Sequence, residues 1–85
     1  MDDRELLALF TRLLRDLLAD DSIVLGMETT RRDVPGWDSF NYVNFIVAVE
    51  SELGIKFRVA DVESFRTVGE IVAEARRISA ERAAG

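Results

Sequence analysis

Apolar residues recur at helical spacing in three segments of the chain, which predicts three main helices. The first covers residues 3–19, where leucine and phenylalanine share one face: Leu6, Phe10, Leu13, Leu14 and Leu17. A second covers residues 39–53 and is ended by Gly54, since glycine readily takes the left-handed conformation that closes helices. The third begins after Thr67, with Glu70 placed to complete a capping box, and runs to about Ala80.

The remaining segments predict a short helix and two connections. Residues 60–65 have room for one or two helical turns, and residues 55–59 alternate like an isolated extended connector. Residues 20–38 form a long first loop, which we expect to be ordered by four apolar residues packed on the core: Ile23, Val24, Leu25 and Met27. We therefore expect an all-α fold, a small four-helix bundle with three main helices and a short third one, formed by residues 1–85 as a single domain.

Composition excludes several function classes. The 85 residues include neither cysteine nor histidine, so thiolate chemistry, disulfides and the commonest general base and metal ligand are absent. The net charge of −5 disfavours nucleic acid and anionic membranes as partners. Residues 1–20 carry acids and arginines within the apolar pattern, unlike a signal peptide. We expect a cytoplasmic monomer that is not an enzyme.

One turn offers candidate chemistry. Pro35 and Gly36 stand where a type II turn favours them, and Trp37 is expected to be exposed. Ser39 follows as the predicted N-cap of the second helix. Because helix N-termini present free N–H groups to anions, this serine beside Asp38 is a plausible attachment point for a phosphate group.

The chain from residue 3 to about residue 78 resembles the acyl carrier protein family. The stretch DVPGWDSFNYVNFIVAVESELGIKF is similar to that family's second helix, with its Asp-Ser opening and its closing Gly-Ile-x-Phe segment. The resemblance continues through Val62 and Phe65 into Thr67-Val68-Gly69, which resembles the opening of the family's fourth helix.

The resemblance implies a function for the turn. By motif match, Ser39 is the residue to which a separate phosphopantetheinyl transferase adds 4′-phosphopantetheine from coenzyme A, and Asp38 helps that transferase hold metal and coenzyme. The arm then holds acyl intermediates as thioesters. The other implied partners are acyl-loading and acyl-processing enzymes of fatty acid, lipid or polyketide-type biosynthesis.

The chain departs from the family pattern on the face where partners bind. Phe40 replaces the usual leucine, Asn44 stands where a glutamate is common, and residues 38–65 carry five acids and two bases. This mildly acidic segment predicts a specialised rather than a housekeeping carrier, because electrostatic steering is weaker. Our candidates for the partner face are Phe40, Val43, Val47, Glu50 and Glu63.

Other residues near the turn have two interpretations. Val47 and Phe65 either line a space for the acyl chain or pack in the core. Arg31 and Arg32 are either solvated or contact the prosthetic phosphate or an acidic partner.

Two alternative functions remain open at this point. The first is an aminoacyl or peptidyl carrier, although Gly36-Trp37-Asp38 departs from the motif that is more common there. The second is an unmodified helical adaptor in which Ser39 only caps a helix. A DNA-binding domain is disfavoured by the charge and by the lack of a basic recognition helix.

Overall fold

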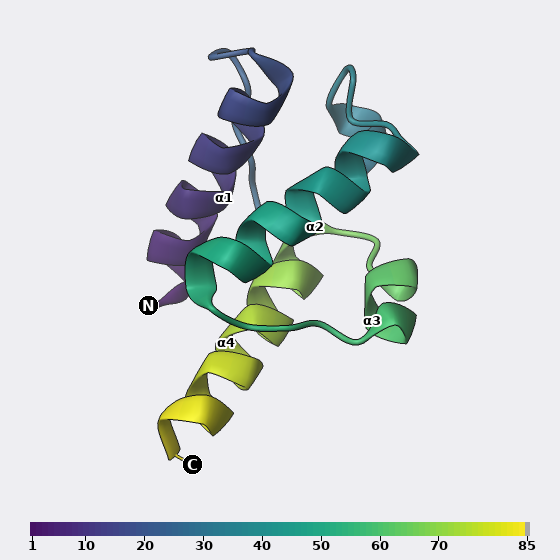
Figure 1. Cartoon of the computed structure of the whole chain (residues 1–85). Coiled ribbons are helices and arrows are strands. Elements are labelled where there is room, and N and C mark those ends of the chain that lie inside the picture. The colour runs from purple at the N-terminus through teal and green to yellow at the C-terminus, as the bar shows by residue number, and fades with distance from the viewer. Residues whose placement is uncertain (85) are drawn as a thin grey trace.

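The computed structural model describes residues 1–84 and contains four α-helices (Figure 1). These are α1 (Asp3–Leu18), α2 (Ser39–Leu53), α3 (Val59–Ser64) and α4 (Val68–Ala84), with a short 3-10 helix at Arg31–Asp33. The described residues include no strand, which confirms the predicted all-α bundle with a short third helix. None of the described helices is long and apolar enough to cross a membrane.

Local chemistry sets the ends of α1 and α2. The Asp2 carboxylate accepts from the Glu5 amide, and the Glu5 carboxylate accepts from the Asp2 amide, so α1 begins with a capping box. Ala19 adopts a left-handed conformation (φ 52°), which ends α1 one residue earlier than predicted. Gly54 closes α2 in the same way (φ 64°), as the sequence predicts.

The two C-terminal helices differ slightly from their predicted bounds. α3 begins at Val59 rather than at residue 60, and it ends one residue earlier than expected. α4 continues to Ala84 instead of ending near Ala80. This extension contains alanine, glutamate and arginine, which are strong helix formers and favour continuation of the helix.

An aromatic cluster joins α1, α2 and the turn before α2. The ring of Phe45 meets Phe10 edge-on at 5.5 Å between centroids, and meets Trp37 in a similar geometry at 5.2 Å. α1 packs against both α2 and α4 around this cluster (Figure 1). α4 contributes four side chains to the core: Val68, Ile71, Val72 and Ala75.

The first loop is ordered by only two of the four apolar residues expected to hold it. Ile23 and Leu25 are buried, whereas Val24 is 77% exposed and Met27 is also exposed. The expectation for Val24 and Met27 was therefore wrong. Val24 lies in a stretch without helical structure, and Met27 lies in a turn, and side chains in such surface connections commonly face solvent.

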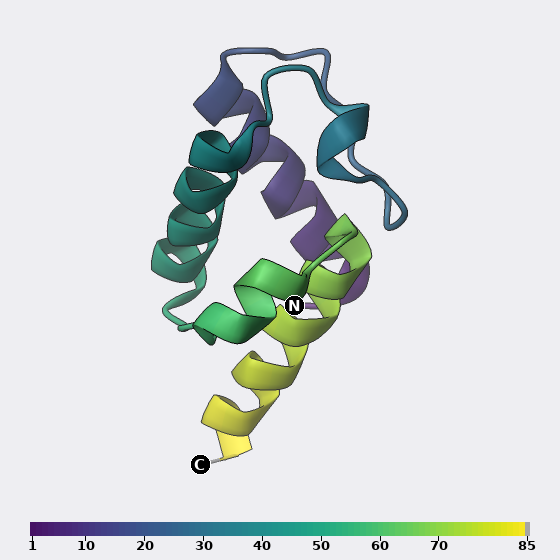
Figure 2. The ribbon, with the colours of Figure 1, turned by 90° about the vertical axis from the view of Figure 1, so that its right-hand side faces the viewer.

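Backbone hydrogen bonds tie the second half of this loop to the start of α4. The Val68 amide donates to the Thr29 carbonyl at 2.9 Å, and the Gly69 amide donates to the Met27 carbonyl at 2.8 Å. A Cβ atom at Gly69 would lie 2.7 Å from that Met27 oxygen, so this contact requires glycine. The loop is thereby held beside the start of α4 (Figure 2).

The core provides a matched stability test. Phe45 is fully buried in the aromatic cluster, whereas Phe40 is 74% exposed on the same helix. We predict that Phe45→Ala lowers the free energy of unfolding by about 3–5 kcal/mol. Phe40→Ala should change it by less than about 0.5 kcal/mol, because it leaves no cavity. Urea unfolding of the two variants measures both free energies. Equal losses in the two variants would contradict this packing.

Candidate functional site

Ser39 is the first residue of α2, and its neighbour Asp38 caps the helix. The Asp38 carboxylate accepts from the Asn41 amide at 2.9 Å, while the Asn41 side-chain amide donates to the Gly36 carbonyl at 3.0 Å. The prediction that Ser39 is the N-cap was therefore wrong by one residue. Because Asp38 satisfies the helix start, the exposed Ser39 hydroxyl is not needed for capping.

The turn before Ser39 is held by a buried tryptophan. Gly36 has a positive φ of 85°, and the Trp37 amide donates to the Val34 carbonyl at 3.2 Å, which confirms the predicted type II turn. Trp37 was expected to be exposed, but only 4% of it is accessible. Its ring packs on Phe45 and lies 6.3 Å from Tyr42, so it anchors the turn to the core.

Ser39 opens into a surface hollow of about 770 Å³. The hollow is lined by residues from the first loop, the start of α2 and the junction between α3 and α4: Thr30, Arg31, Arg32, Trp37, Asp38, Ser39, Phe65 and Arg66. Three of its lining side chains are guanidinium groups. Such a wall favours an anionic ligand next to the serine.

Arg31 is positioned over the serine by an aromatic ring. Its guanidinium lies 4.7 Å from the centre of the Tyr42 ring, and its Nη1 atom lies 3.5 Å from the Ser39 hydroxyl. Tyr42 is in turn fixed, because its hydroxyl donates to the Val62 carbonyl at 2.5 Å. Burial raises the pKa of Tyr42, so the phenol stays neutral and keeps this bond to α3 at neutral pH.

Three of the predicted partner-face residues form an apolar stripe on α2. Phe40, Val43 and Val47 are all exposed, and their spacing puts them on one side of the helix. Glu63 is exposed on the neighbouring α3. The sequence analysis missed Val59, which is 74% exposed at the start of α3. Val47 is 52% exposed and does not pack in the core, and its place beside an acyl chain stays a prediction.

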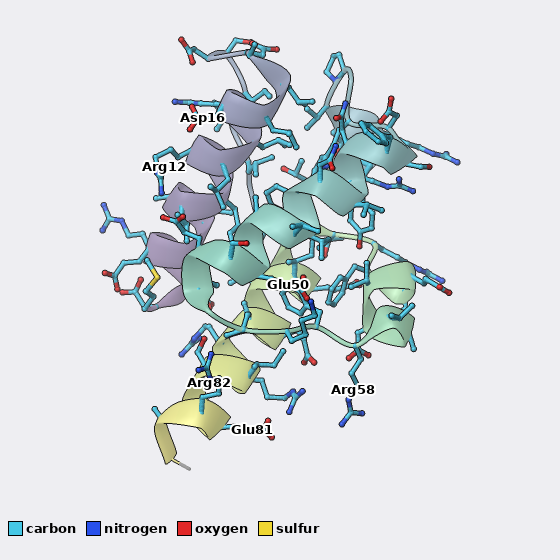
Figure 3. All side chains as sticks on the ribbon, viewed as in Figure 1. Arg12, Asp16, Glu50, Arg58, Glu81 and Arg82 are labelled. Carbon is cyan, nitrogen blue, oxygen red and sulfur yellow. The ribbon has the colours of Figure 1, made fainter. Side chains whose placement is uncertain are left out.

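Glu50, which is labelled in Figure 3, stands three residues after Val47 and therefore on the side of α2 that carries the stripe, but only 13% of its side chain is exposed. One of its carboxylate oxygens accepts from the Phe57 amide at 2.8 Å, and the other lies 4.0 Å from the Lys56 ammonium group. Its charge is thus committed to holding the connection between α2 and α3. The place of Glu50 on the partner face stays a prediction.

Phe65 packs in the core, which is one of the two roles considered for it, and its place beside an acyl chain stays a prediction. It is partly buried, and its ring meets Phe57 edge-on at 5.6 Å, as ordinary core packing requires. Part of its surface also lines the hollow beside Ser39. Arg66 was not identified from the sequence, because only folding brings its segment next to the serine. Tyr42, three residues after Ser39 on α2, was given no role at the site, because its contact with Arg31 exists only in the folded chain.

The hollow fits a phosphate ester on Ser39. An exposed hydroxyl stands at a helix N-terminus, where the backbone favours anions, and Arg31 lies within reach of the same oxygen. Arg32 and Arg66 add positive charge to the wall. Across residues 1–84, the structure contains no cluster of three or more carboxylate ligands that could hold a metal ion.

The chain is similar to known proteins in sequence and in fold. Residues 4–75, which include Ser39, match the family described as phosphopantetheine attachment site. Acyl carrier proteins from strains of Clostridium perfringens are 38% identical over 63 residues, which is 69% of this chain and 83% of theirs. The solution NMR structure of holo acyl carrier protein from Geobacter metallireducens has a TM-score of 0.84 at 32% identity, covering 92% of this chain and 90% of that one.

The cap geometry predicts that substitutions at two adjacent residues differ in their effect on stability. Asp38→Ala removes the bond to the Asn41 amide and should lower the free energy of unfolding by about 1 kcal/mol. Ser39→Ala removes a hydroxyl that caps nothing and should change it by less than about 0.5 kcal/mol. Chemical denaturation of both variants measures these free energies of unfolding. A larger loss of stability for Ser39→Ala than for Asp38→Ala would show that serine is the cap.

Proposed function

Since the chain belongs to the acyl carrier protein family, we propose that Ser39 carries its 4′-phosphopantetheine arm and that the loaded chain presents acyl groups as thioesters. Phosphopantetheine is the prosthetic group of this family. The observation that carries the assignment to Ser39 is its exposed hydroxyl at the start of α2, beside Arg31 and free of capping. The arm supplies the thiol that a chain without cysteine lacks.

Asp38 and Ser39, the two residues of the Asp-Ser motif, have different roles in this proposal. On the transferase, the Ser39 oxygen forms the new phosphoester bond and gives up its proton, while the pyrophosphate bond of coenzyme A breaks and adenosine 3′,5′-bisphosphate leaves. Asp38 keeps one carboxylate oxygen on the Asn41 amide, which fixes the start of α2. Its second oxygen is available to the metal and coenzyme held by the transferase. The serine is thereby presented on a rigid turn rather than on a free loop.

Partners recognise mainly the apolar stripe of Phe40, Val43 and Val47. The two acids near the end of α2 are engaged within the protein, Glu50 with the Phe57 amide and Glu52 with Arg12 at 3.1 Å. The stripe itself lies between Ser39 and these acids. Recognition therefore depends on shape and apolar contact more than on charge, which supports a specialised pathway of fatty acid, lipid or polyketide type.

Loading with the arm gives the first test. The chain is incubated with coenzyme A, magnesium and a promiscuous phosphopantetheinyl transferase, and the intact mass is measured. We predict a gain of one phosphopantetheine group. Ser39→Ala should abolish the gain, while Ser51→Ala, an exposed serine later on α2, should leave it unchanged.

Two results would contradict this proposal. A folded wild-type chain that gains no mass would favour the unmodified adaptor instead. A Ser39→Ala chain that still gains the group would place the arm on another hydroxyl. Circular dichroism of each variant establishes that the helices are intact before the masses are compared.

The apolar stripe gives a second test with the same transferase as the probe. We predict that Val43→Ser and Val47→Ser together lower kcat/KM for loading by about tenfold, a loss expected when central apolar contacts are removed. Val24→Ser is the matched control, because Val24 is more exposed than either residue and lies on the first loop. An equal loss for the control, or no loss for the pair, would exclude the stripe as the recognition surface.

A further inference from the structure

Trp37 carries a buried hydrogen-bond donor without an acceptor. Its indole Nε1 atom is inaccessible to solvent, and no described residue accepts its proton. A buried donor left unpaired costs about 1–3 kcal/mol. Such a group in an otherwise well-packed protein points to an acceptor that the described chain does not itself provide.

The same tryptophan forms part of the wall around Ser39. Trp37 lines the hollow into which Ser39 opens, and it also lines a narrow crevice shared with Tyr42 and Phe65. Arg31 and Arg66 border both spaces. The unpaired donor therefore belongs to a residue that lines the same hollow as Ser39, Arg31 and Arg66.

The arginines of the hollow are not neutralised by nearby carboxylates. Among residues 1–84, Arg31, Arg32 and Arg66 form no ion pair within 4.0 Å. Asp33 and Asp38, which lie near Arg31 and Arg32 along the chain, have other tasks, since Asp33 accepts from the Thr30 amide at 2.9 Å and Asp38 caps α2. An acidic protein thus keeps a cationic hollow next to one serine, and Tyr42 holds Arg31 in place there.

We infer that this hollow binds the base of the arm attached to Ser39. Arg31 and Arg66 pair with the phosphodiester, and the pantoyl segment that follows the phosphate opens the narrow crevice beside Trp37, so that the buried indole donates to one of its oxygens. This inference rests on the proposed function, because it requires the arm on Ser39. The hollow then holds the first part of the arm on the loop and α3 side, which leaves the apolar stripe of α2 open to partners.

The single tryptophan of the chain gives a direct readout. One indole N–H signal is expected in a ¹H–¹⁵N correlation spectrum, and it can be compared between the unloaded chain and the loaded chain. We expect this signal to move downfield on loading and its exchange with solvent to slow by roughly tenfold, because the donor gains an acceptor. An unmoved signal with unchanged exchange in fully loaded protein would overturn the inference.

Charge variants test the arginines in the loaded protein. In Arg66→Gln, and separately in Arg31→Gln, we expect the ³¹P line of the phosphodiester to narrow by about twofold or more, because a released phosphate moves faster than the protein tumbles. Arg66→Gln removes a positive charge from the hollow but leaves the contact between Arg31 and Tyr42 intact. Its effect on the ³¹P line therefore reports the loss of charge and not a loss of packing. Arg82→Gln, on the distant end of α4, is the matched control and should leave the line unchanged (Figure 3).

The outcomes separate the two proposals. Absence of the mass gain contradicts loading at Ser39, whereas full loading with ³¹P widths equal in all variants overturns only the binding of the arm in the hollow. Ser39→Ala protein mixed with coenzyme A provides the last comparison. An indole shift there, and none on loading of the wild type, would mean that the hollow serves the incoming coenzyme, which overturns the inference as stated.

Discussion

The contact between Trp37 and Phe45 is the constraint on which the site depends. Phe45 lies in the core on α2 and also meets Phe10 of α1. The indole of Trp37 is therefore connected through Phe45 to both helices. The type II turn places Trp37 two residues before Ser39. Packing of one aromatic ring thereby determines where the serine hydroxyl stands, and Asp38 then fixes the direction of the helix behind it.

Charge is distributed so that acids and bases near the site have different roles. Asp33, Asp38 and Glu50 accept from backbone amides and act as parts of the local structure. Arg31 is held by an aromatic ring instead of a carboxylate, which preserves its charge for a ligand. The resulting surface is cationic around Ser39 and apolar along α2, in a chain whose net charge is −5.

The sequence was sufficient for elements defined by local signals. The bounds of α2 follow from Gly54 and the Asp-Ser pair, but that pair alone does not tell which residue caps, because both types are good N-caps. Features that depend on distant segments were missed or wrong. The sequence places Trp37 in a loop, and its burial against Phe45 is visible only in the structure. The Glu50 carboxylate accepts from the Phe57 amide because the chain turns back after α2. The neighbourhood of Arg66 and Ser39 likewise exists only in the folded chain.

The most direct test of the account is to locate the added group within the loaded chain. Peptides from the transferase reaction are fragmented in the mass spectrometer, and the residue that carries phosphopantetheine is read from the fragment masses. We predict that the whole addition lies on Ser39. An addition on Ser22, Ser51 or Ser64 would contradict it, because none of these serines stands at the capped start of α2 beside Arg31.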